Sequence, residues 1–521
     1  MTSPSPVIRR LSAAIAAIVA GVTLTACSSA IAGTASTDAS TVSVTSTATS
    51  ATTALADNVA SHAESGDLDY DADAAVTITL ADGASTSSST SGVAIDGDTV
   101  TISAAGTYVL SGTLSDGRIV VASDADGTVK LVLDNASVTS SSGSAFVITA
   151  ADEAVVVLAD GTSNSLADGT GYDTSADDAP NAALFSMADL TIGGAGSLTV
   201  TGNTNDGIAG KDGLVIQGGT ITVTAVDDGI RGKDYLIVED ATVSVDAKDD
   251  ALKSDNEADD TVGYVLIKSG TVTLAAGDDG IHAEGDLAIQ GGKVTVSTSN
   301  EGLEGSTVTI AGGDTSVTST DDGLNATQGS TTDSAAAGGG GGMQSDGSLL
   351  TISGGTLLVN AQGDGLDSNG SLVITGGTTV VSGPTTSGNG ALDSNGGITM
   401  SGGTLVAAGS SGMAEAPSTD STTGWVSVTF AQAIAAGETV SIVKDGTVIA
   451  AYTTVKQVSS LIVADSDITS GQTYDVYVGG TLSGTAVGTY SDSGDLSGAT
   501  KNTTVTAGEH TSSGFGGGGH R

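Results

Sequence analysis

A short block with the pattern acid-glycine-aliphatic recurs through the middle of this chain at intervals of about 22 residues. Asp206-Gly207-Ile208 and Asp228-Gly229-Ile230 are 22 residues apart, and the next copy follows after another 22. A fixed period in the twenties is typical of a solenoid, in which each repeat stacks on the one before it. The acid of each repeat is therefore expected to lie beside the acid of the next, in a column that we call the acid ladder. Its members are Asp206, Asp228, Asp250, Asp279, Glu301, Asp322 and Asp364.

The residues between the blocks predict which kind of solenoid this is. Each repeat contains two short runs in which aliphatic residues alternate with Thr or Ser around a turn, as in residues 214–224 and 287–296. Alternation with a period of two, rich in Val, Ile and Thr, is typical of β-strands. With a third short strand after each acid, we predict an all-β fold, a right-handed parallel β-helix with about 22 residues per rung. A leucine-rich repeat shares the period, but it requires a helix or an asparagine ladder.

Composition and the limits of the repeat predict how the chain is divided. The 76 glycines and the aromatic content of 3% suit thin rungs with tight corners. At 521 residues, the chain is long enough for one long solenoid and a smaller module. We expect an N-terminal capping β region of the helix at 76–180, regular rungs with the acid ladder at 181–410, a C-terminal β module or cap at 411–510, and a disordered Gly-rich tail at 511–521.

The N-terminus has the pattern of a bacterial lipoprotein leader. Arg9 and Arg10 precede an apolar run that ends in Leu24-Thr25-Ala26-Cys27. This pattern predicts a signal peptide at 1–26, followed by a cysteine that becomes lipidated. Residues 27–75 are rich in Ser, Thr and Ala and are expected to form a tether. The protein should therefore be secreted to the extracellular face of a bacterial membrane and touch that membrane only through its lipid. Because Cys27 is the only cysteine, no disulfide is expected within the chain.

The charge of the chain excludes some partners and favours others. Its 60 acids and 15 Lys and Arg residues give a formal net charge of −45. A chain with this charge would repel the phosphates of DNA or RNA, so nucleic acid is excluded as a natural partner. Extracellular calcium is the natural counterion, and we expect the protein to be a monomer.

Doubled acids in adjacent repeats predict a metal site. Neighbouring rungs lie roughly 4.8 Å apart, the spacing of paired strands. Equivalent carboxylates would then repel each other by on the order of 1 kcal/mol in water, and by more at a protein surface. Turn chemistry explains a single Asp-Gly pair, but doubled acids on successive rungs favour a bound cation, and oxygen ligands favour calcium over zinc. The candidate metal ligands are Asp206, Asp227, Asp228, Asp249, Asp250, Asp278, Asp279, Asp321, Asp322, Asp364, Asp367 and Asp393.

A second column lies three residues after each ladder acid, and three consecutive members of it are the bases Arg231, Lys253 and His282. One interpretation is that these bases only neutralise the ladder. The other is that they bind a polyanionic sugar together with calcium, which would bridge to uronate carboxylates. A base beside calcium is also what β-elimination of a uronate needs, because the metal acidifies the proton at C5 and a base of lowered pKa removes it.

The ordered series of blocks resembles a known family, the secreted carbohydrate-binding β-helix proteins related to polysaccharide lyases. The resemblance covers about residues 76–500 and implies a pectate-lyase-like β-helix, bound calcium, and binding of cellulose or polygalacturonate without established catalysis. By analogy with the calcium-dependent lyases, Lys253 is the candidate base, although those enzymes often have an acid where Arg231 stands. The blocks that carry the resemblance include Asn205-Asp-Gly-Ile208, Asp227-Asp-Gly-Ile-Arg-Gly-Lys-Asp234, Asp249-Asp-Ala-Leu-Lys-Ser-Asp-Asn256 and Gly363-Asp-Gly-Leu-Asp-Ser-Asn-Gly370.

Three functions follow from these observations. The first is a cell-surface lipoprotein that binds an acidic, pectin-like polysaccharide or cellulose through a calcium-loaded β-helix, without catalysis. The second is a calcium-dependent polysaccharide lyase that uses Lys253 or Arg231. The third is a structural surface protein or adhesin that calcium stiffens. Aromatic residues suited to stack on flat cellulose are scarce, since Trp425 is the only Trp, and this favours acidic sugars.

Overall fold

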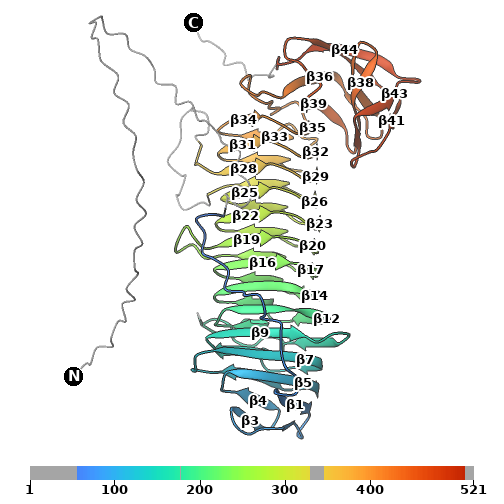
Figure 1. The fold of residues 1–521 in the computed structure, drawn as a ribbon. Helices are drawn as coiled ribbons and strands as arrows, with labels where there is room; N and C mark the ends of the chain where they lie inside the picture. The colour runs from blue at the N-terminus through green and yellow to red at the C-terminus, as the bar shows by residue number, and fades with distance from the viewer. Residues whose placement is uncertain (1–54, 177, 329–344, 511–521) are drawn as a thin grey trace, which may run out of the picture. The chain divides into compact units, whose positions relative to one another are not determined.

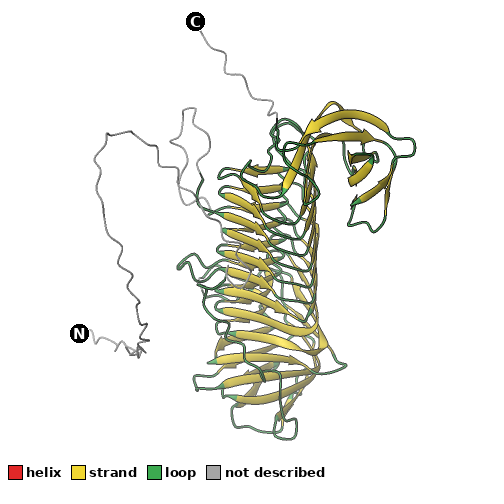
Figure 2. Ribbon diagram, turned by 45° about the horizontal axis from the view of Figure 1, so that its top comes forward, coloured by secondary structure: helices red, strands yellow, loops and turns green. Residues whose placement is uncertain are grey.

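The computed structural model describes residues 55–176, 178–328 and 345–510. All the regular secondary structure within these residues is β-strand, as the colours in Figure 2 show. Two sheets, of 24 and 13 strands, consist mainly of parallel pairs. The prediction of an all-β fold based on parallel strands is confirmed. The predicted leader with Cys27 and the predicted tail at 511–521 lie outside the described residues. The search of the described part of the chain found no helix with the length and hydropathy to cross a membrane.

One repeat of the stack contains three strands, and we call this unit a rung. β15 (Ile230–Gly232) belongs to the 13-stranded sheet, whereas β16 (Tyr235–Glu239) and β17 (Thr242–Asp246) belong to the 24-stranded sheet. Each strand pairs in parallel with its counterpart in the next rung, and Figure 1 shows the rungs as successive layers. The three counterparts are β18 (Leu252–Ser254), β19 (Tyr264–Ile267) and β20 (Thr271–Ala275).

The same arrangement continues along the described chain. The other strands of the 13-stranded sheet are β3 (Val93–Asp96), β4 (Thr99–Ile102), β6 (Arg118–Ala122), β8 (Phe146–Ala150), β11 (Ala182–Ser186), β13 (Asp206–Gly210), β21 (Ile281–Ala283), β24 (Leu303–Gly305), β27 (Leu324–Ala326), β30 (Leu366–Ser368) and β33 (Leu392–Ser394). The 24-stranded sheet also contains β1 (Val76–Ala81), β2 (Thr86–Ser87), β5 (Gly106–Leu114), β7 (Thr128–Thr139), β9 (Glu153–Leu158), β10 (Ser163–Ala167), β12 (Leu190–Gly202), β14 (Gly213–Ala225), β22 (Asp286–Ile289), β23 (Lys293–Thr298), β25 (Thr307–Ile310), β26 (Asp314–Thr318), β28 (Leu349–Ile352), β29 (Thr356–Asn360), β31 (Ser371–Ile374), β32 (Thr378–Ser382), β34 (Ile398–Met400) and β35 (Thr404–Gly409).

The strand register places equivalent residues of neighbouring rungs side by side. Ile208 pairs with Ile230, and Ile230 pairs with Leu252. Leu252 pairs in turn with Ile281, although the rung that begins with Leu252 is longer, because its additional residues lie between β18 and β19. Parallel stacking begins before residue 181, since β1 pairs with β5 and β4 pairs with β6. The region 76–180, predicted as the capping β region at the start of the helix, contains parallel rungs.

The inward-facing column of aliphatic residues after each ladder acid is fully buried, and a glycine precedes most of its members. A Cβ added to Gly229 would lie 2.2 Å from Cγ1 of Val245 in the same rung and 2.5 Å from the carbonyl oxygen of Ala251 in the next rung, so close approach favours glycine here. Its φ is not positive, so a left-handed corner is not the reason. Alanine stands at this place in several rungs, including those of Ala183, Ala251 and Ala391. The register puts Leu274 and Ala407 at the place of Val245 in the last two, whereas the rung of Ala183 has the β-branched Val200 there.

Residues 55–69 lie along the outside of the 24-stranded sheet, and we call them the N-terminal strap. The N–H of Val59 donates to the carbonyl of Thr261 at 2.8 Å. Further along, Lys130 Nζ donates to the carbonyl of Gly66 at 3.4 Å. Thr261 and Lys130 belong to different rungs, so the strap crosses the strands, as the dark blue segment in Figure 1 shows.

The strap covers an apolar patch that faces away from the main core. The rings of Tyr235 and Tyr264 stack with their centroids 5.1 Å apart, and the two residues are only 4% and 3% exposed. Above them, His62 Nδ1 lies 2.7 Å from the hydroxyl of Tyr235 and 3.2 Å from a carboxylate oxygen of Asp189. Covering this patch removes apolar surface from water. The described part of the predicted tether at 27–75 therefore packs on the sheet along residues 55–69, which the Ser/Thr/Ala-rich composition did not predict.

The last rung continues into a C-terminal module of antiparallel strands. β35 pairs antiparallel with β39 (Val458–Asp465), which also pairs with β36 (Gly424–Ile434). The module has its own buried cluster, which includes Tyr452 and Tyr474. Its five-stranded sheet consists of β42 (Tyr490–Ser491), β38 (Thr447–Thr453), β37 (Thr439–Lys444), β40 (Thr473–Val478) and β44 (Thr500–Thr506), and β41 (Thr481–Ser483) pairs with β43 (Ser493–Asp495).

Candidate functional site

One ladder acid lies in the turn before each of β15, β18, β21, β24, β27 and β30, and Asp206 begins β13. Backbone hydrogen bonds align these turns: the N–H of Gly207 donates to the carbonyl of Asp228 at 3.0 Å, and the N–H of Gly229 donates to the carbonyl of Asp250 at 2.8 Å. The same kind of bond joins Gly302 to Asp322. The acids predicted from the period thus lie in one column, joined rung to rung through the backbone.

The ladder carboxylates also bond along the column. Oδ1 of Asp228 accepts the N–H of Asp250 at 3.3 Å, and Oδ1 of Asp250 accepts the N–H of Asp279 at 2.9 Å. Further on, Oδ1 of Asp322 accepts the N–H of Asp364 at 2.6 Å. Since an unmade bond to a buried N–H is costly, these carboxylates stabilise the next turn. This structural role is independent of any ligand.

Arg231 and Lys253 neutralise the acids at the start of the ladder. Arg231 Nη2 lies 3.1 Å from Asp206, and Arg231 Nη1 lies 3.0 Å from Asp255 on the other side. Lys253 Nζ lies 2.7 Å from Asp250 and 3.4 Å from Asp228. The register pairs Arg231 with Lys253, as the sequence spacing predicts.

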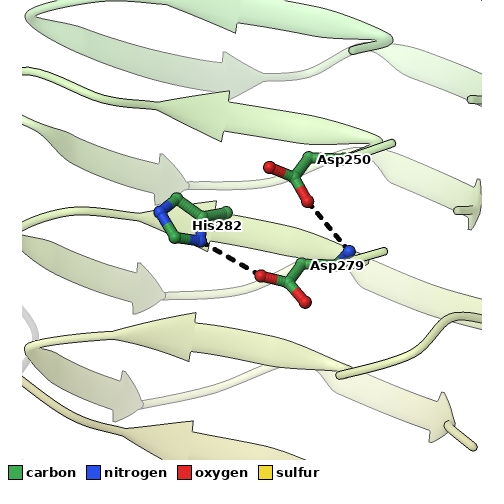
Figure 3. Close-up of side chains that lie close together, drawn as sticks. All are labelled: Asp250, Asp279 and His282. Carbon is green, nitrogen blue, oxygen red and sulfur yellow. Dashed lines mark hydrogen bonds and ion pairs between the residues drawn. The ribbon is translucent and has the colours of Figure 1, made fainter. Parts of the chain in front are cut away.

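His282 continues this column in the next rung. Its Nδ1 lies 3.0 Å from Oδ2 of Asp279, and Figure 3 shows the imidazole beside that carboxylate, with Asp250 bonded to the backbone of Asp279. Burial by itself lowers the pKa of His282, but the hydrogen bond to Asp279 and the charges of Asp250 and Glu304 raise it to about 9. We call Asp206, Asp228, Asp250 and Asp279, with their three bases, the paired half of the ladder.

In the paired half, burial and ion pairing shift the pKa values of the side chains in opposite directions. Burial raises the pKa of Asp228 to about 8, with a further increase from Asp206, although Lys253 acts in the opposite direction. Burial raises the pKa of Asp206 to about 7, against the charge of Arg231. Burial lowers the pKa of Lys253, but Asp228 and Asp250 outweigh this and hold it above its ordinary value. The contact between Lys253 and Asp250 is the shortest of these ion pairs and holds the lysine in its charged form.

The other end of the ladder has acids without bases, and we call it the unpaired half. Burial raises the pKa of Asp322 to about 7, of Asp364 to about 6 and of Asp367 to about 8. Burial likewise raises the pKa of Asp393, and it raises that of Glu415 to about 7. Among the described residues, no Lys, Arg or His offsets these five shifts. The unpaired half is therefore a column of half-buried carboxyl groups without a neighbouring base among the described residues.

Several acids lie close enough to share one ion. The ligand atoms of Asp227, Asp228 and Asp249 lie within 4.8 Å of one another, as do those of Asp279, Glu301 and Glu304. The group of Asp250, Asp279 and His282 has the same spacing, but there His282 and a backbone N–H already bind the carboxylates. Asp278 and Asp321 are exposed, at the outer edge of the column.

Sequence reasoning did not name Glu415 or Asp255 as members of this site, whereas Glu304 lies in the column that was predicted three residues after each ladder acid. Glu415 bonds the N–H of Ser394 at 3.1 Å, beside Asp393. Its position is 22 residues after Asp393, so the period of the repeat was a signal that could have found it. Asp255 lies in the insertion between β18 and β19, and no periodic signal marks it.

Arg231 and Lys253 do not have the environment of a base for β-elimination. The carboxylates around both side chains hold their pKa values above the ordinary ones, although burial acts in the opposite direction. A base that removes a proton from carbon near neutral pH needs a lowered pKa. The geometry thus favours charge neutralisation for these two residues.

Comparison with known proteins identifies a related group. Residues 96–348 match the family model of carbohydrate-binding domain-containing proteins. A carbohydrate-binding domain-containing protein of Acetivibrio thermocellus is 35% identical over 136 residues, which are 26% of this chain and 48% of the relative. The matched region thus spans about half the length of that relative.

A solved structure is also similar, the polysaccharide lyase-like protein from C. thermocellum as a gadolinium derivative. Its sequence identity is 31% and its TM-score is 0.39, over 46% of this chain and 93% of that one. The family match includes the paired half of the ladder and ends before Asp364. The resemblance predicted from the sequence is thus confirmed: through residues 96–348 this chain is similar to the carbohydrate-binding domain-containing proteins.

Proposed function

We propose that this protein binds an extracellular polysaccharide without cleaving it, and that calcium held by the unpaired half of the acid ladder takes part in the binding. The observation that carries this proposal is the contrast between the two halves. Ion pairs with Arg231, Lys253 and His282 neutralise the first half, whereas the second half has only acids. The match to carbohydrate-binding domain-containing proteins supports the choice of ligand class.

The residues of the unpaired half offer the ligand chemistry that a hard divalent cation takes, although the acids whose ligand atoms lie within 4.8 Å of one another are those around Asp227 and Asp279. Asp322, Asp364, Asp367 and Asp393 supply carboxylate oxygens, which calcium prefers. Oδ1 of Asn325 is a buried oxygen without a hydrogen-bond partner among the described residues. The register places Asn325 directly beside Asp367. An amide oxygen and several carboxylates together form a suitable calcium ligand set, and bound calcium would offer its remaining positions to sugar oxygens.

Binding is favoured over β-elimination for a specific reason. Lys253 and Arg231 form ion pairs with buried carboxylates, so neither supplies the neutral base that a lyase needs. In this proposal, Lys253 and Arg231 stabilise the acid ladder through their ion pairs. A structural protein or adhesin that is only stiffened by calcium remains the alternative, and it predicts calcium binding without glycan binding.

Calorimetric titration of calcium into the chelator-treated protein tests the metal assignment. Asp367→Asn with Asp393→Asn should weaken calcium binding at least tenfold. The matched control is Asp227→Asn with Asp249→Asn, which removes the same charge from acids beside the paired half and should have a much smaller effect. Loss of calcium binding only in the control variant would place the metal in the paired half and contradict our assignment.

Titration with polygalacturonate and a pull-down with cellulose, each with calcium and with chelator, test the glycan. We expect calcium-dependent binding to polygalacturonate and no increase in the ultraviolet absorbance of unsaturated products. An increase that requires calcium would make the protein a lyase. Binding of neither polymer, with intact calcium binding, would favour the structural alternative.

The scaffold and the location of the protein are part of the proposal. We infer that the rungs coil as a right-handed, pectate-lyase-like β-helix, because parallel strands of one sheet joined by crossovers are right-handed in about 98% of cases. We further infer export, lipidation at Cys27 and function as a monomer on the cell surface. Metabolic labelling with a fatty acid should label the protein but not Cys27→Ala, and an unlabelled wild-type protein would contradict the anchor.

A further inference from the structure

A pocket of about 250 Å³ lies where successive strands of the 24-stranded sheet end. Thr318 ends β26 and Asn360 ends β29, while Thr385 and Thr386 follow β32. Lys456 lies on the opposite side, in the loop between β38 and β39 of the C-terminal module. The pocket thus combines three neighbouring rungs with one side chain of the module, and the match to the carbohydrate-binding family ends before Asn360.

Lys456 has an unusual environment for a base in a chain with a net charge of −45. Its ammonium group donates to the carbonyl of Ala361, the residue after the end of β29. Among the described residues, no carboxylate lies within ion-pair distance of it, unlike Lys253 in the paired half. Burial lowers its pKa to about 8, and no neighbouring charge opposes this shift. The carbonyl of Ala361 accepts a hydrogen bond from one of the three N–H groups of the ammonium.

The other lining groups are hydroxyls and amides. Thr385 and Thr386 are exposed, and the amides of Asn360 and Gln362 complete the rim. No acid and no aromatic ring lines the pocket. Pockets for drug-sized ligands occupy about 300–1,000 Å³, so this smaller space suits one sugar ring of a longer chain. A charged donor among hydroxyl and amide groups is complementary to a sugar that carries both hydroxyls and a carboxylate.

We propose that this pocket is a subsite for one uronic acid residue of the bound polysaccharide, with Lys456 Nζ donating to the sugar carboxylate and Asn360, Thr385 and Thr386 contacting its hydroxyls. This inference rests on the proposed polysaccharide binding and specifies its ligand as an acidic one. The subsite is distinct from the acid ladder, and its donors come from the chain itself. The C-terminal module then contributes directly to recognition.

Titration of the chelator-free, calcium-loaded protein with trigalacturonate tests the inference. Lys456→Met should weaken binding at least tenfold, while binding of the fully methyl-esterified trimer, which has no carboxylate, should be weak in the wild type and unchanged in the variant. The matched control is Lys501→Met, which removes the same charge from the module, where Lys501 forms an ion pair with Asp475 at 2.7 Å. Lys501→Met should bind like the wild type.

A second measurement covers the case in which Lys456→Met does not fold. In the wild-type protein, the ε-carbon resonance of Lys456 should shift when trigalacturonate is added, and Thr386→Val should weaken binding severalfold. Equal binding by wild type and both variants would overturn the subsite but leave the proposed function intact. Failure of the wild type to bind any uronate would overturn both. Displacement of trigalacturonate by equimolar inorganic phosphate would make this a general anion site and would also overturn the assignment to a sugar.

Discussion

The ammonium group of Lys253 lies 2.7 Å from a carboxylate oxygen of Asp250, three residues before it on the same turn. The same ammonium lies 3.4 Å from Asp228 in the neighbouring rung. One base therefore links two steps of the acid ladder, and its side chain is only 20% exposed. Such a base supports the stack, whether or not a ligand is bound.

Replacing this base should destabilise the fold. Lys253→Met removes the base closest to both buried carboxylates, Asp250 and Asp228, and breaking a buried pair in this way costs about 3–5 kcal/mol. Denaturant unfolding at pH 7 measures the change in the free energy of unfolding. Lys248→Met is the control, because Lys248 and Asp246 form an exposed pair, 65% and 61% accessible, and such pairs contribute little. Equal effects of the two substitutions would show that the ladder does not depend on Lys253.

The contact between Gly229 and Val245 predicts a compensating pair of substitutions. Gly229→Ala should destabilise the protein by about 1–3 kcal/mol, because the new methyl overpacks against Val245. Gly229→Ala with Val245→Leu reproduces the combination that Ala251 and Leu274 form in the next rung, and should recover part of this loss. A double-mutant cycle in denaturant measures the coupling. If the two effects simply added, the side-chain clash would not be the reason for the glycine.

The pKa of Asp367 predicts how stability depends on pH. Its folded value of about 8 lies above the ordinary 3.8, so the folded state holds a proton that the unfolded state releases. This contribution to stability is complete below about pH 4 and is lost as the pH rises through about 8. In chelator, the melting temperature should therefore fall between pH 5 and pH 8, by less in Asp367→Asn.

Calcium provides the control for this pH dependence. Calcium binds carboxylates that have lost their protons, and such carboxylates are more abundant at pH 8 than at pH 5. Calcium should therefore raise the melting temperature at pH 8 more than at pH 5. The same increase at both values would contradict binding to carboxyl groups of raised pKa. The magnesium salt at equal ionic strength distinguishes specific binding from screening.

His62 predicts the behaviour of the N-terminal strap. His62→Ala removes the contacts of the imidazole with Tyr235, Asp189 and Thr191 and should cost about 1–3 kcal/mol. Residues 55–69 should then be cleaved faster in limited proteolysis. Ser61→Ala is the matched control, since its hydroxyl bonds only to Ala63 within the strap. Unchanged cleavage of His62→Ala would mean that other contacts hold the strap.

Much of this architecture could be predicted from the sequence because it is periodic. The spacing from Asp228 to Asp250 and the alternating residues between them predict parallel strands in stacked rungs, and the register confirms the alignment of the ladder. The column of Arg231, Lys253 and His282 could also be predicted, because each base stands three residues after a ladder acid in the sequence. Strand pairing joins residues 21 or 22 positions apart in several rungs, and longer rungs keep the same alignment of their strands, so a local pattern determines a long-range contact. Glu415 shows that the period extends further than was recognised.

Only the tertiary structure decided which charges meet. Spacing placed bases beside acids, but the distances and burial show that the first acids are neutralised while Asp367 and its neighbours are not. The position of Lys456 against Ala361, and of His62 against Tyr235, joins residues far apart in the chain. Such contacts carry no periodic signal, because each occurs once and depends on how separate surfaces fold together. The sequence by itself thus determined the repeating scaffold, whereas the tertiary structure decided the electrostatics and the single contacts made on it.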